Sequence, residues 1–182
     1  MFFLNRGESM KIILSAGKAQ SGKTTVANIL KDLCKEKNLR ACITEYSKYI
    51  KMFAKELTDW NGEIASKPRA FLQDFGSFVR QNKGEDFFIK RMKEDISIYS
   101  SFVDVLIISD IRFPREITSL KEYHPLTIKV DNHFEEKSLT KEEEAHETEH
   151  ALDNFFDFDY SIKDKSLNEM REILKKIVEE EL

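Results

Sequence analysis

The hydrophobic and polar positions of this chain alternate between short apolar runs and longer stretches of helical periodicity. The apolar runs predict strands at 11–16, 39–46, 103–108, 126–130 and 158–162. Hydrophobic residues spaced three or four apart predict a helix through Val26, Ile29, Leu30 and Leu33, and further helices at 47–60, 68–83, 85–100, 114–121 and after the capping box that begins at Ser166. Strands that alternate with helices imply an α/β fold with a mainly parallel sheet of about five strands, covered on both faces in three layers.

Two segments differ from the rest in composition. Residues 103–108 are almost wholly apolar and β-branched, which is typical of a central strand in a parallel sheet, and this strand is predicted to end at Ser109-Asp110. Residues 132–150 are crowded with Lys and Glu and lack a strong apolar stripe. Because that segment lies between two predicted core strands, we interpret it as a surface excursion and a candidate lid.

Composition narrows the class of protein. The 182 residues are enough for one domain over 1–182, and the formal net charge of −4 gives no global field that would recruit nucleic acid or a membrane surface. No apolar run approaches transmembrane length. Cys34 and Cys42 fit no metal or disulfide framework, so we expect reduced, buried thiols in a cytoplasmic protein. Residues 1–9 precede Met10, which we interpret as the natural start, with a genuine short extension as the alternative.

One motif connects this pattern to chemistry. Residues 17–24 read G-K-A-Q-S-G-K-T, a phosphate-binding loop between a predicted strand and a predicted amphipathic helix. Loop N–H groups and the helix N-terminus point at an anion in such a loop, so ATP and Mg²⁺ are the expected cofactors. Lys23 is predicted to reach the β/γ-phosphates, and the Thr24 hydroxyl to ligate Mg²⁺. The predicted nucleotide-binding residues are Gly17, Lys18, Ala19, Gln20, Ser21, Gly22, Lys23, Thr24 and Thr25.

A second group of polar residues follows the apolar strand. Asp110 is placed where ligands collect in parallel sheets and suits Mg²⁺ coordination, or alternatively capping of the next helix. Arg112, beside Phe113-Pro114, is suited to fork onto a phosphate, with a surface salt bridge as the alternative. The chain carries no N-K-x-D motif of a GTPase and is short for a motor ATPase, which leaves a small kinase.

Several segments then resemble the deoxynucleoside monophosphate kinase family, which is related to the phosphomevalonate and dephospho-CoA kinases. The likeness is carried by G-K-A-Q-S-G-K at 17–23, Y-S-K-Y-I-K at 46–51, R-x-x-L-Q-x-x-G at 69–76 followed by D-F-F at 86–88, and I-S-D-I-R-F-P-x-E at 108–116. A weaker match is H-x-T-E at 146–149. Family members often have aspartate after the loop lysine, where this chain has Thr24. The candidate lid contains no arginine, so Lys137 and Lys141 would serve there.

The resemblance implies transfer of the γ-phosphoryl group from ATP to a deoxynucleoside monophosphate. It implies catalytic roles for Lys23, Lys18, Asp110 and Arg112. The metal site predicted at Thr24 and Asp110 rests instead on the loop motif and on the end of the apolar strand. A helical acceptor-binding region would span 47–100. The implied substrate-binding residues are Lys48, Arg69, Gln73, Phe75, Arg80 and Arg112. For Phe75, which shares a helical face with Phe71 and Phe78, packing in the core is the favoured interpretation.

Other functions stay open at this point. The chain could phosphorylate another small acceptor such as dephospho-CoA, or bind ATP as a regulator without transferring phosphate, and a homodimer is an open alternative. Residues 146–150 also match the zinc-protease pattern H-E-x-x-H, which would place His146 and His150 on one face if the segment were helical. Because Glu and His fall together easily in a charge-rich segment, we favour a lid or helix-cap role.

Overall fold

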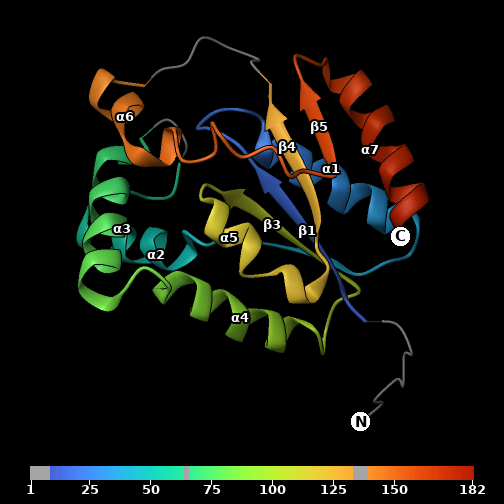
Figure 1. Cartoon of the computed structure of the whole chain (residues 1–182), viewed down its shortest axis with the longest axis horizontal. Coiled ribbons are helices and arrows are strands. Elements are labelled where there is room, and N and C mark those ends of the chain that lie inside the picture. The colour runs from blue at the N-terminus through green and yellow to red at the C-terminus, as the bar shows by residue number, and fades with distance from the viewer. Residues whose placement is uncertain (1–8, 64–65, 133–138) are drawn as a thin grey trace.

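Five parallel strands form one sheet in the order β2-β3-β1-β4-β5 (Figure 1). The computed structural model describes residues 9–63, 66–132 and 139–182. Within them the strands are β1 (Lys11–Ala16), β2 (Ala41–Thr44), β3 (Val105–Ile111), β4 (Leu126–Asp131) and β5 (Tyr160–Lys163). The expected α/β class and the five-stranded parallel sheet are therefore confirmed.

Helices cover both faces of the sheet, as the long apolar strands require. The helices are α1 (Lys23–Glu36), α2 (Lys48–Leu57), α3 (Arg69–Lys83), α4 (Phe87–Tyr99), α5 (Pro114–Thr118), α6 (Lys141–Ala145) and α7 (Leu167–Glu181). Successive strand residues point to opposite faces, so Ile13 and Ile107 pack with α1 and α7, whereas Ile12 and Leu106 pack with α2, α4 and α5. This confirms the three-layer arrangement.

The sheet order creates a crevice at one end of β1. This strand lies between β3 and β4, so the chain leaves β1 toward β2 and β3 and later returns on its other side. Ligands in open parallel sheets bind at such a switch point, beyond the carboxyl ends of the strands. The loop of residues 17–22, between β1 and α1, lies at this place.

The element boundaries differ from the sequence predictions in instructive ways. β3 begins two residues later than predicted and continues to Ile111, so Asp110 lies inside the strand instead of after it. Two predicted helix ends are confirmed: α3 ends before Gly84, which has φ 95° and suits glycine, and α7 begins with Ser166 and Glu169 in a capping box.

The candidate lid at 132–150 is only partly what its composition indicated. Its first residue, Asn132, is buried, donates its Nδ2–H to Lys165 O at 2.7 Å and donates its backbone N–H to Ser21 O at 3.1 Å. Asn132 therefore belongs to the core and ties the loop of residues 17–22 to the start of α7. The remainder contains α6 and a 3₁₀ helix at Glu147–Glu149, while Lys137 and the proposed extension before Met10, apart from Ser9, lie outside the described residues.

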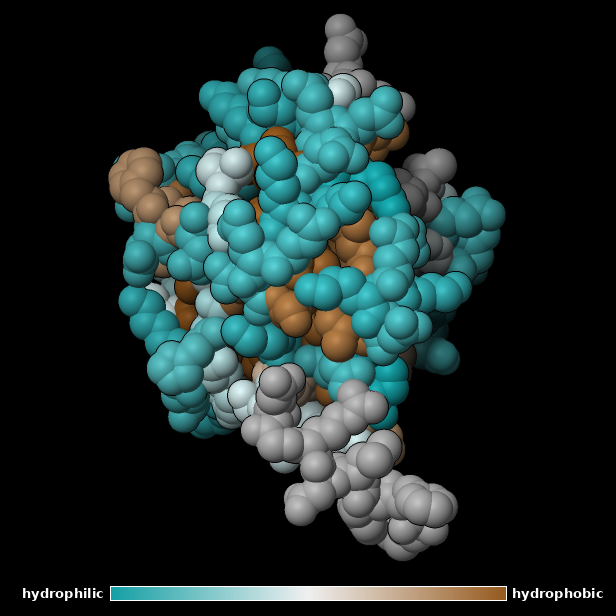
Figure 2. All heavy atoms as spheres, turned by 90° about the vertical axis from the view of Figure 1, so that its right-hand side faces the viewer, coloured by the Kyte–Doolittle hydropathy of each residue, from teal (hydrophilic) through white to brown (hydrophobic). Residues whose placement is uncertain are grey.

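The surface around α7 is mostly hydrophilic, with hydrophobic side chains in a small central area (Figure 2). Cys34 is a buried free thiol, as expected, whereas the free thiol of Cys42 is half-buried. Among the described residues, none of the helices is both long enough and apolar enough to cross a membrane.

Candidate active site

The loop of residues 17–22 has the backbone that close wrapping around an anion requires. Gly17 has φ 152° and Gly22 has φ 89°, both in the positive region that favours glycine. A Cβ on Gly17 would lie 2.2 Å from the carbonyl oxygen of Val130, so no other residue fits against β4. Gly22 then starts α1 directly, which places the N-terminus of that helix at the crevice.

Lys23 is held inside this loop. Its Nζ donates to Gly17 O at 2.9 Å and to Lys18 O, and the residue is 7% exposed. Burial lowers the pKa of Lys23 well below its ordinary value of 10.5, the charge of Arg112 lowers it further, and Glu149 opposes the shift. An anion at this position would stabilise the charged ammonium, which is what a phosphate-binding lysine requires.

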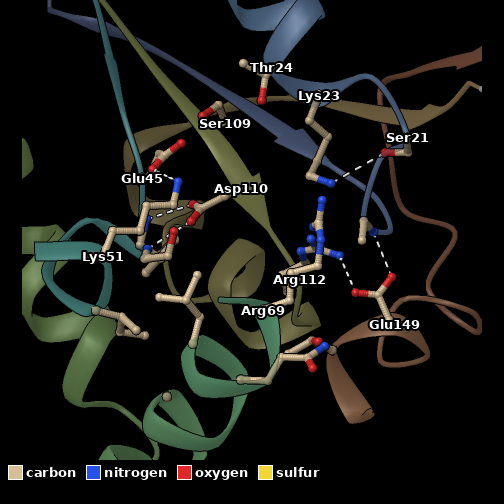
Figure 3. Close-up of a pocket in the computed structure, with 18 of the residues that line it drawn as sticks. Ser21, Lys23, Thr24, Glu45, Lys51, Arg69, Ser109, Asp110, Arg112 and Glu149 are labelled. Atoms are coloured by element: carbon tan, nitrogen blue, oxygen red, sulfur yellow. Dashed lines mark hydrogen bonds and ion pairs between the residues drawn. The ribbon is translucent and has the colours of Figure 1, made fainter. Parts of the chain in front are cut away.

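A cavity of about 620 Å³ opens in front of the loop. One wall is the loop and the start of α1, and the other is formed by the β2–α2 turn, α3 and the end of β3. Figure 3 shows Lys23, Arg112 and Glu149 on one side, with Lys51 and Asp110 on the other. The predicted site residues that line it are Ala19, Gln20, Ser21, Gly22, Lys23, Thr24, Thr25, Arg69, Gln73, Arg80, Asp110 and Arg112. Most of the residues predicted from distant parts of the chain are thus brought together.

Four predicted site residues do not line the cavity: Gly17, which lies against Val130 of β4, and Lys48, Phe75 and Lys18. Lys48 has its Nζ 2.6 Å from the Asp95 carboxylate on α4, so it links two helices on the outer side of α2 and does not line the cavity. Phe75 stacks on Phe71 at 5.7 Å between ring centroids and does not line the cavity either, which agrees with the favoured core interpretation. Lys18 turns outward and pairs with Asp153 at 2.7 Å.

Asp110 holds the turn between β2 and α2. Its Oδ1 accepts the backbone N–H of Tyr46 at 2.7 Å, and its Oδ2 accepts that of Ser47 at 2.9 Å (Figure 3). The alternative that Asp110 caps the next helix is wrong, because that end is satisfied by Glu116, whose carboxylate accepts from Arg112 N at 2.7 Å and Phe113 N at 3.1 Å. Asp110 also lines the cavity, and each of its oxygens accepts one of these backbone hydrogen bonds and has a second lone pair.

Between the loop and the β2–α2 turn, the cavity carries a cluster of cations that sequence reasoning found only in part. Lys51, which pairs with Glu45, and Lys67 line the cavity together with Arg69 and Arg112. Burial lowers the pKa of Lys67 to about 8, and the neighbouring charges of Lys51, Arg69 and Arg112 contribute. Lys67 directly precedes Pro68 at the start of α3, yet a lone lysine in a loop gave no signal of a site. This cluster matches the chemistry of a bound anion.

Glu149, the last residue of the weak H-x-T-E match, is a second cavity residue to which the sequence analysis gave no role. It is 6% exposed, its Oε2 accepts the backbone N–H of Ala19 at 2.7 Å, and its Oε1 accepts from Arg112 Nη1 at 2.9 Å. Arg112 therefore forms the ion pair that the alternative expected, but with a buried partner at the cavity and not at the plain surface. Arg80 stacks on the Phe113 ring at 4.8 Å and contacts Glu147 at 3.2 Å.

The H-E-x-x-H segment does not form one helical face. His146 ends α6 and its ring lies 3.0 Å from Thr148 Oγ1 and 3.4 Å from Ser77 Oγ, whereas His150 contacts Asp153 and the Glu144 carbonyl. Within the described part of the chain, no group of three or more His, Cys, Asp or Glu residues is placed to hold a metal ion. The helical arrangement that a zinc protease needs is absent from this segment.

Comparison with known proteins gives a fold and no sequence family. No protein-family model and no curated protein matches this chain. A Cys556Ala mutant of the Mycobacterium tuberculosis APS kinase superposes with a TM-score of 0.54 at 13% identity, over 94% of this chain and 99% of that one. The same kinase in complex with AMPPNP and APS gives a TM-score of 0.53 at 12% identity, over 94% and 98%.

A third solved structure has the same fold. Shikimate kinase from Acinetobacter baumannii in complex with shikimate superposes with a TM-score of 0.50 at 15% identity, over 96% of this chain and 97% of that one. Identities this low show the fold alone. Together with the loop of residues 17–24, the five-stranded parallel sheet and its strand order, they show that this chain has the same three-layer P-loop α/β fold as these structures.

Proposed function

We propose that this protein is an ATP-dependent kinase that transfers the γ-phosphoryl group to the phosphate of a (deoxy)nucleoside monophosphate. One observation carries the proposal: a single cavity joins the loop that holds Lys23 to the cation cluster of Lys51, Lys67, Arg69 and Arg112. The loop accounts for the nucleotide phosphates. A second cluster of cations facing it is what a phosphorylated acceptor needs, and a neutral acceptor does not.

The reaction asks mainly for positioning and charge stabilisation. An oxygen of the acceptor phosphate forms a bond to the γ-phosphorus while the bond from that phosphorus to the β,γ-bridging oxygen breaks, and ADP leaves. Lys23 would stabilise charge on the transferring group, with Lys18 able to join it after leaving Asp153. Arg112 and Arg69 would hold the acceptor phosphate, with Arg80 and Gln73 further along the same wall.

The residues at the cavity fit a magnesium ion. Thr24 lines the cavity at the start of α1, and Asp110 lines it with free lone pairs on both carboxylate oxygens. Oxygen ligands of this kind are what Mg²⁺ prefers. When bound, the ion would neutralise charge on the β- and γ-phosphates.

Two other functions remain as alternatives. A kinase of another small acceptor, such as dephospho-CoA, APS or shikimate, would use the same loop with different contacts on the α3 wall. A regulator that binds ATP without transferring phosphate would need no second cation cluster, so the cavity favours a kinase.

The test is a coupled assay of ADP release over the deoxy- and ribonucleoside monophosphates, with dephospho-CoA, APS and shikimate as competing acceptors. We expect turnover that depends on a nucleoside monophosphate. Lys23→Ala should lower turnover by a factor of about 10³ with the circular dichroism spectrum unchanged, because charge stabilisation is lost from the site. The exposed Lys31→Ala on α1 is the matched control. ATP binding without turnover on any acceptor would support the regulator instead.

A further inference from the structure

Glu149 stands out from the acidic segment that carries it. The neighbouring Glu142, Glu144 and Glu147 are exposed, whereas Glu149 is 6% exposed and lines the cavity. Burying a carboxylate is costly unless it is paired and hydrogen-bonded, so a buried glutamate in a segment of exposed ones needs a specific reason. Its two contacts supply that reason.

The Glu149 carboxylate bridges the nucleotide side and the acceptor side of the cavity. One oxygen accepts the Ala19 N–H of the loop at 2.7 Å, and the other accepts from Arg112 Nη1 at 2.9 Å (Figure 3). Hydrogen bonds to an ionised group are shorter and stronger than neutral ones, and low exposure strengthens them further. The carboxylate therefore fixes the guanidinium of Arg112 at a set place beside the loop.

The same contacts occupy one N–H of the loop and leave its other phosphate-binding groups available. Ala19 gives its N–H to Glu149, whereas Ser21, Gly22, Lys23 and Thr24, which follow it in the loop, also line the cavity. The hydrogen bonds of Lys23 Nζ go to loop oxygens and not to Glu149. Arg112 gives one of its five donors to Glu149 and keeps the others for a ligand. Glu149 therefore positions Arg112 without occupying Lys23, the lysine that would bind phosphate.

The other polar contacts between the segment and the site are more exposed or longer. Lys18 pairs with Asp153 at 2.7 Å with both side chains more than a third exposed, Gln73 Nε2 donates to the Glu143 carbonyl at 3.3 Å, and Arg80 pairs with the exposed Glu147 at 3.2 Å. Exposed ion pairs contribute little, because water and salt screen them. Glu149 is therefore the buried charged contact that joins the docked segment to both the loop and Arg112.

We propose that Glu149 is a positioning residue that couples docking of residues 139–153 to the placement of Arg112 beside the phosphate-binding loop. When the segment is docked, Arg112 is directed at the junction of the two phosphates; when it is not, Arg112 loses its fixed place. The consequence for turnover rests on the proposed kinase function, whereas the consequence for the loop does not.

The first experiment measures the contact directly, without substrate. Amide hydrogen exchange of Ala19, followed by NMR, should become roughly 10-fold faster or more in Glu149→Ala, because a charge-assisted hydrogen bond is lost. Glu144→Ala is the matched control, since it removes an exposed carboxylate of the same segment, and it should leave Ala19 unchanged. Protection of Ala19 equal to that of the wild type in Glu149→Ala would overturn the proposal.

The second experiment separates positioning from binding. In Glu149→Gln, which keeps the shape but not the charge, kcat should fall about 10-fold, because a small misplacement of a positioning group is costly. The KM for ATP should stay within about 3-fold, since the hydrogen bonds of Lys23 and the loop residues after Ala19 do not involve Glu149. Tighter ATP binding with kcat undiminished would show that Glu149 competes with phosphate, and would also overturn the proposal. If the wild type turns over no acceptor, the kinase function fails while Ala19 exchange still decides the role of Glu149.

Discussion

Replacing Asp110 with asparagine tests whether this residue stabilises the structure of the site in addition to its proposed role in binding Mg²⁺. The carboxylate accepts two backbone N–H groups, from Tyr46 at 2.7 Å and from Ser47 at 2.9 Å, and so holds the start of α2 against the end of β3. An asparagine has one oxygen to accept with, and its NH₂ group would face the second backbone N–H. The substitution therefore removes one charge-assisted hydrogen bond and places the NH₂ donor of asparagine against a backbone N–H donor.

The expected cost follows from these contacts. A hydrogen bond to a charged group contributes about 1.5–3 kcal/mol, and water reaches this half-buried turn, so we expect Asp110→Asn to lose about 2–3 kcal/mol of unfolding free energy. For a chain of this size that corresponds to a drop in Tm of roughly 5–10 °C. Urea unfolding followed by circular dichroism should show a midpoint lower by about 1 M with the slope unchanged.

The control is Asp32→Asn on the exposed side of α1, which removes the same charge and should stay within about 0.5 kcal/mol of the wild type. Equal stability of the two variants would refute the structural role. The same proteins then address the metal. If Asp110 also helps to hold Mg²⁺, ATP binding by Asp110→Asn should lose part of its dependence on Mg²⁺ when measured with the ion and with EDTA.

Three further predictions concern single residues. Lys67 has a pKa of about 8 in the folded protein against an ordinary 10.5, so the unfolded chain binds more protons between these values and the free energy of unfolding should rise with pH there, by up to about 1.4 kcal/mol per pH unit. Lys67→Met should flatten this rise relative to the wild type in urea titrations at pH 8 to 10; identical curves would contradict the assignment. Gly17→Ala should cost at least about 3 kcal/mol, because its Cβ meets Val130 O, whereas Gly84→Ala, at positive φ but in open space, should cost about 1 kcal/mol in the same assay. Lys48→Met should lower the thermal midpoint of unfolding, because it breaks the ion pair with Asp95, and should leave the KM for the acceptor unchanged. A raised KM would show that Lys48 does contact the acceptor.

What the sequence could predict depended on how locally each feature is encoded. The loop of residues 17–24 and the capping box at Ser166 lie within a few consecutive residues, and both are found where they were expected. Lys48 and Lys51 are both on α2, three residues apart, and nothing in the sequence says which one turns toward the cavity. That choice is made by Asp95 on α4, which attracts Lys48 to the other side.

Glu149 and Asp110 show the same limit at longer range. The partner of Glu149 in the loop is 130 positions earlier in the chain, and the partners of Asp110 are more than 60 positions away. No periodicity or short motif encodes such a pairing, because it arises only when the sheet order brings β1, β2 and β3 side by side. For this reason the sequence predicted only a surface excursion and a candidate lid for the acidic segment, although one of its carboxylates, that of Glu149, contacts the loop and Arg112.

The lowered pKa values of Lys23 and Lys67 have one physical origin, and it links binding to stability. Each lysine is withdrawn from water beside other cations, Lys23 near Arg112 and Lys67 near Lys51, Arg69 and Arg112. The folded protein therefore carries a local excess of positive charge that costs free energy until an anion enters. A bound phosphate offsets this cost and raises the pKa of both lysines, so binding should take up protons, at Lys67 near pH 8. Any ligand that binds the folded state alone also stabilises it by mass action. A nucleotide that occupies the loop and an acceptor that occupies the cation cluster should for this reason each raise the unfolding midpoint, and the two together should raise it more than either one.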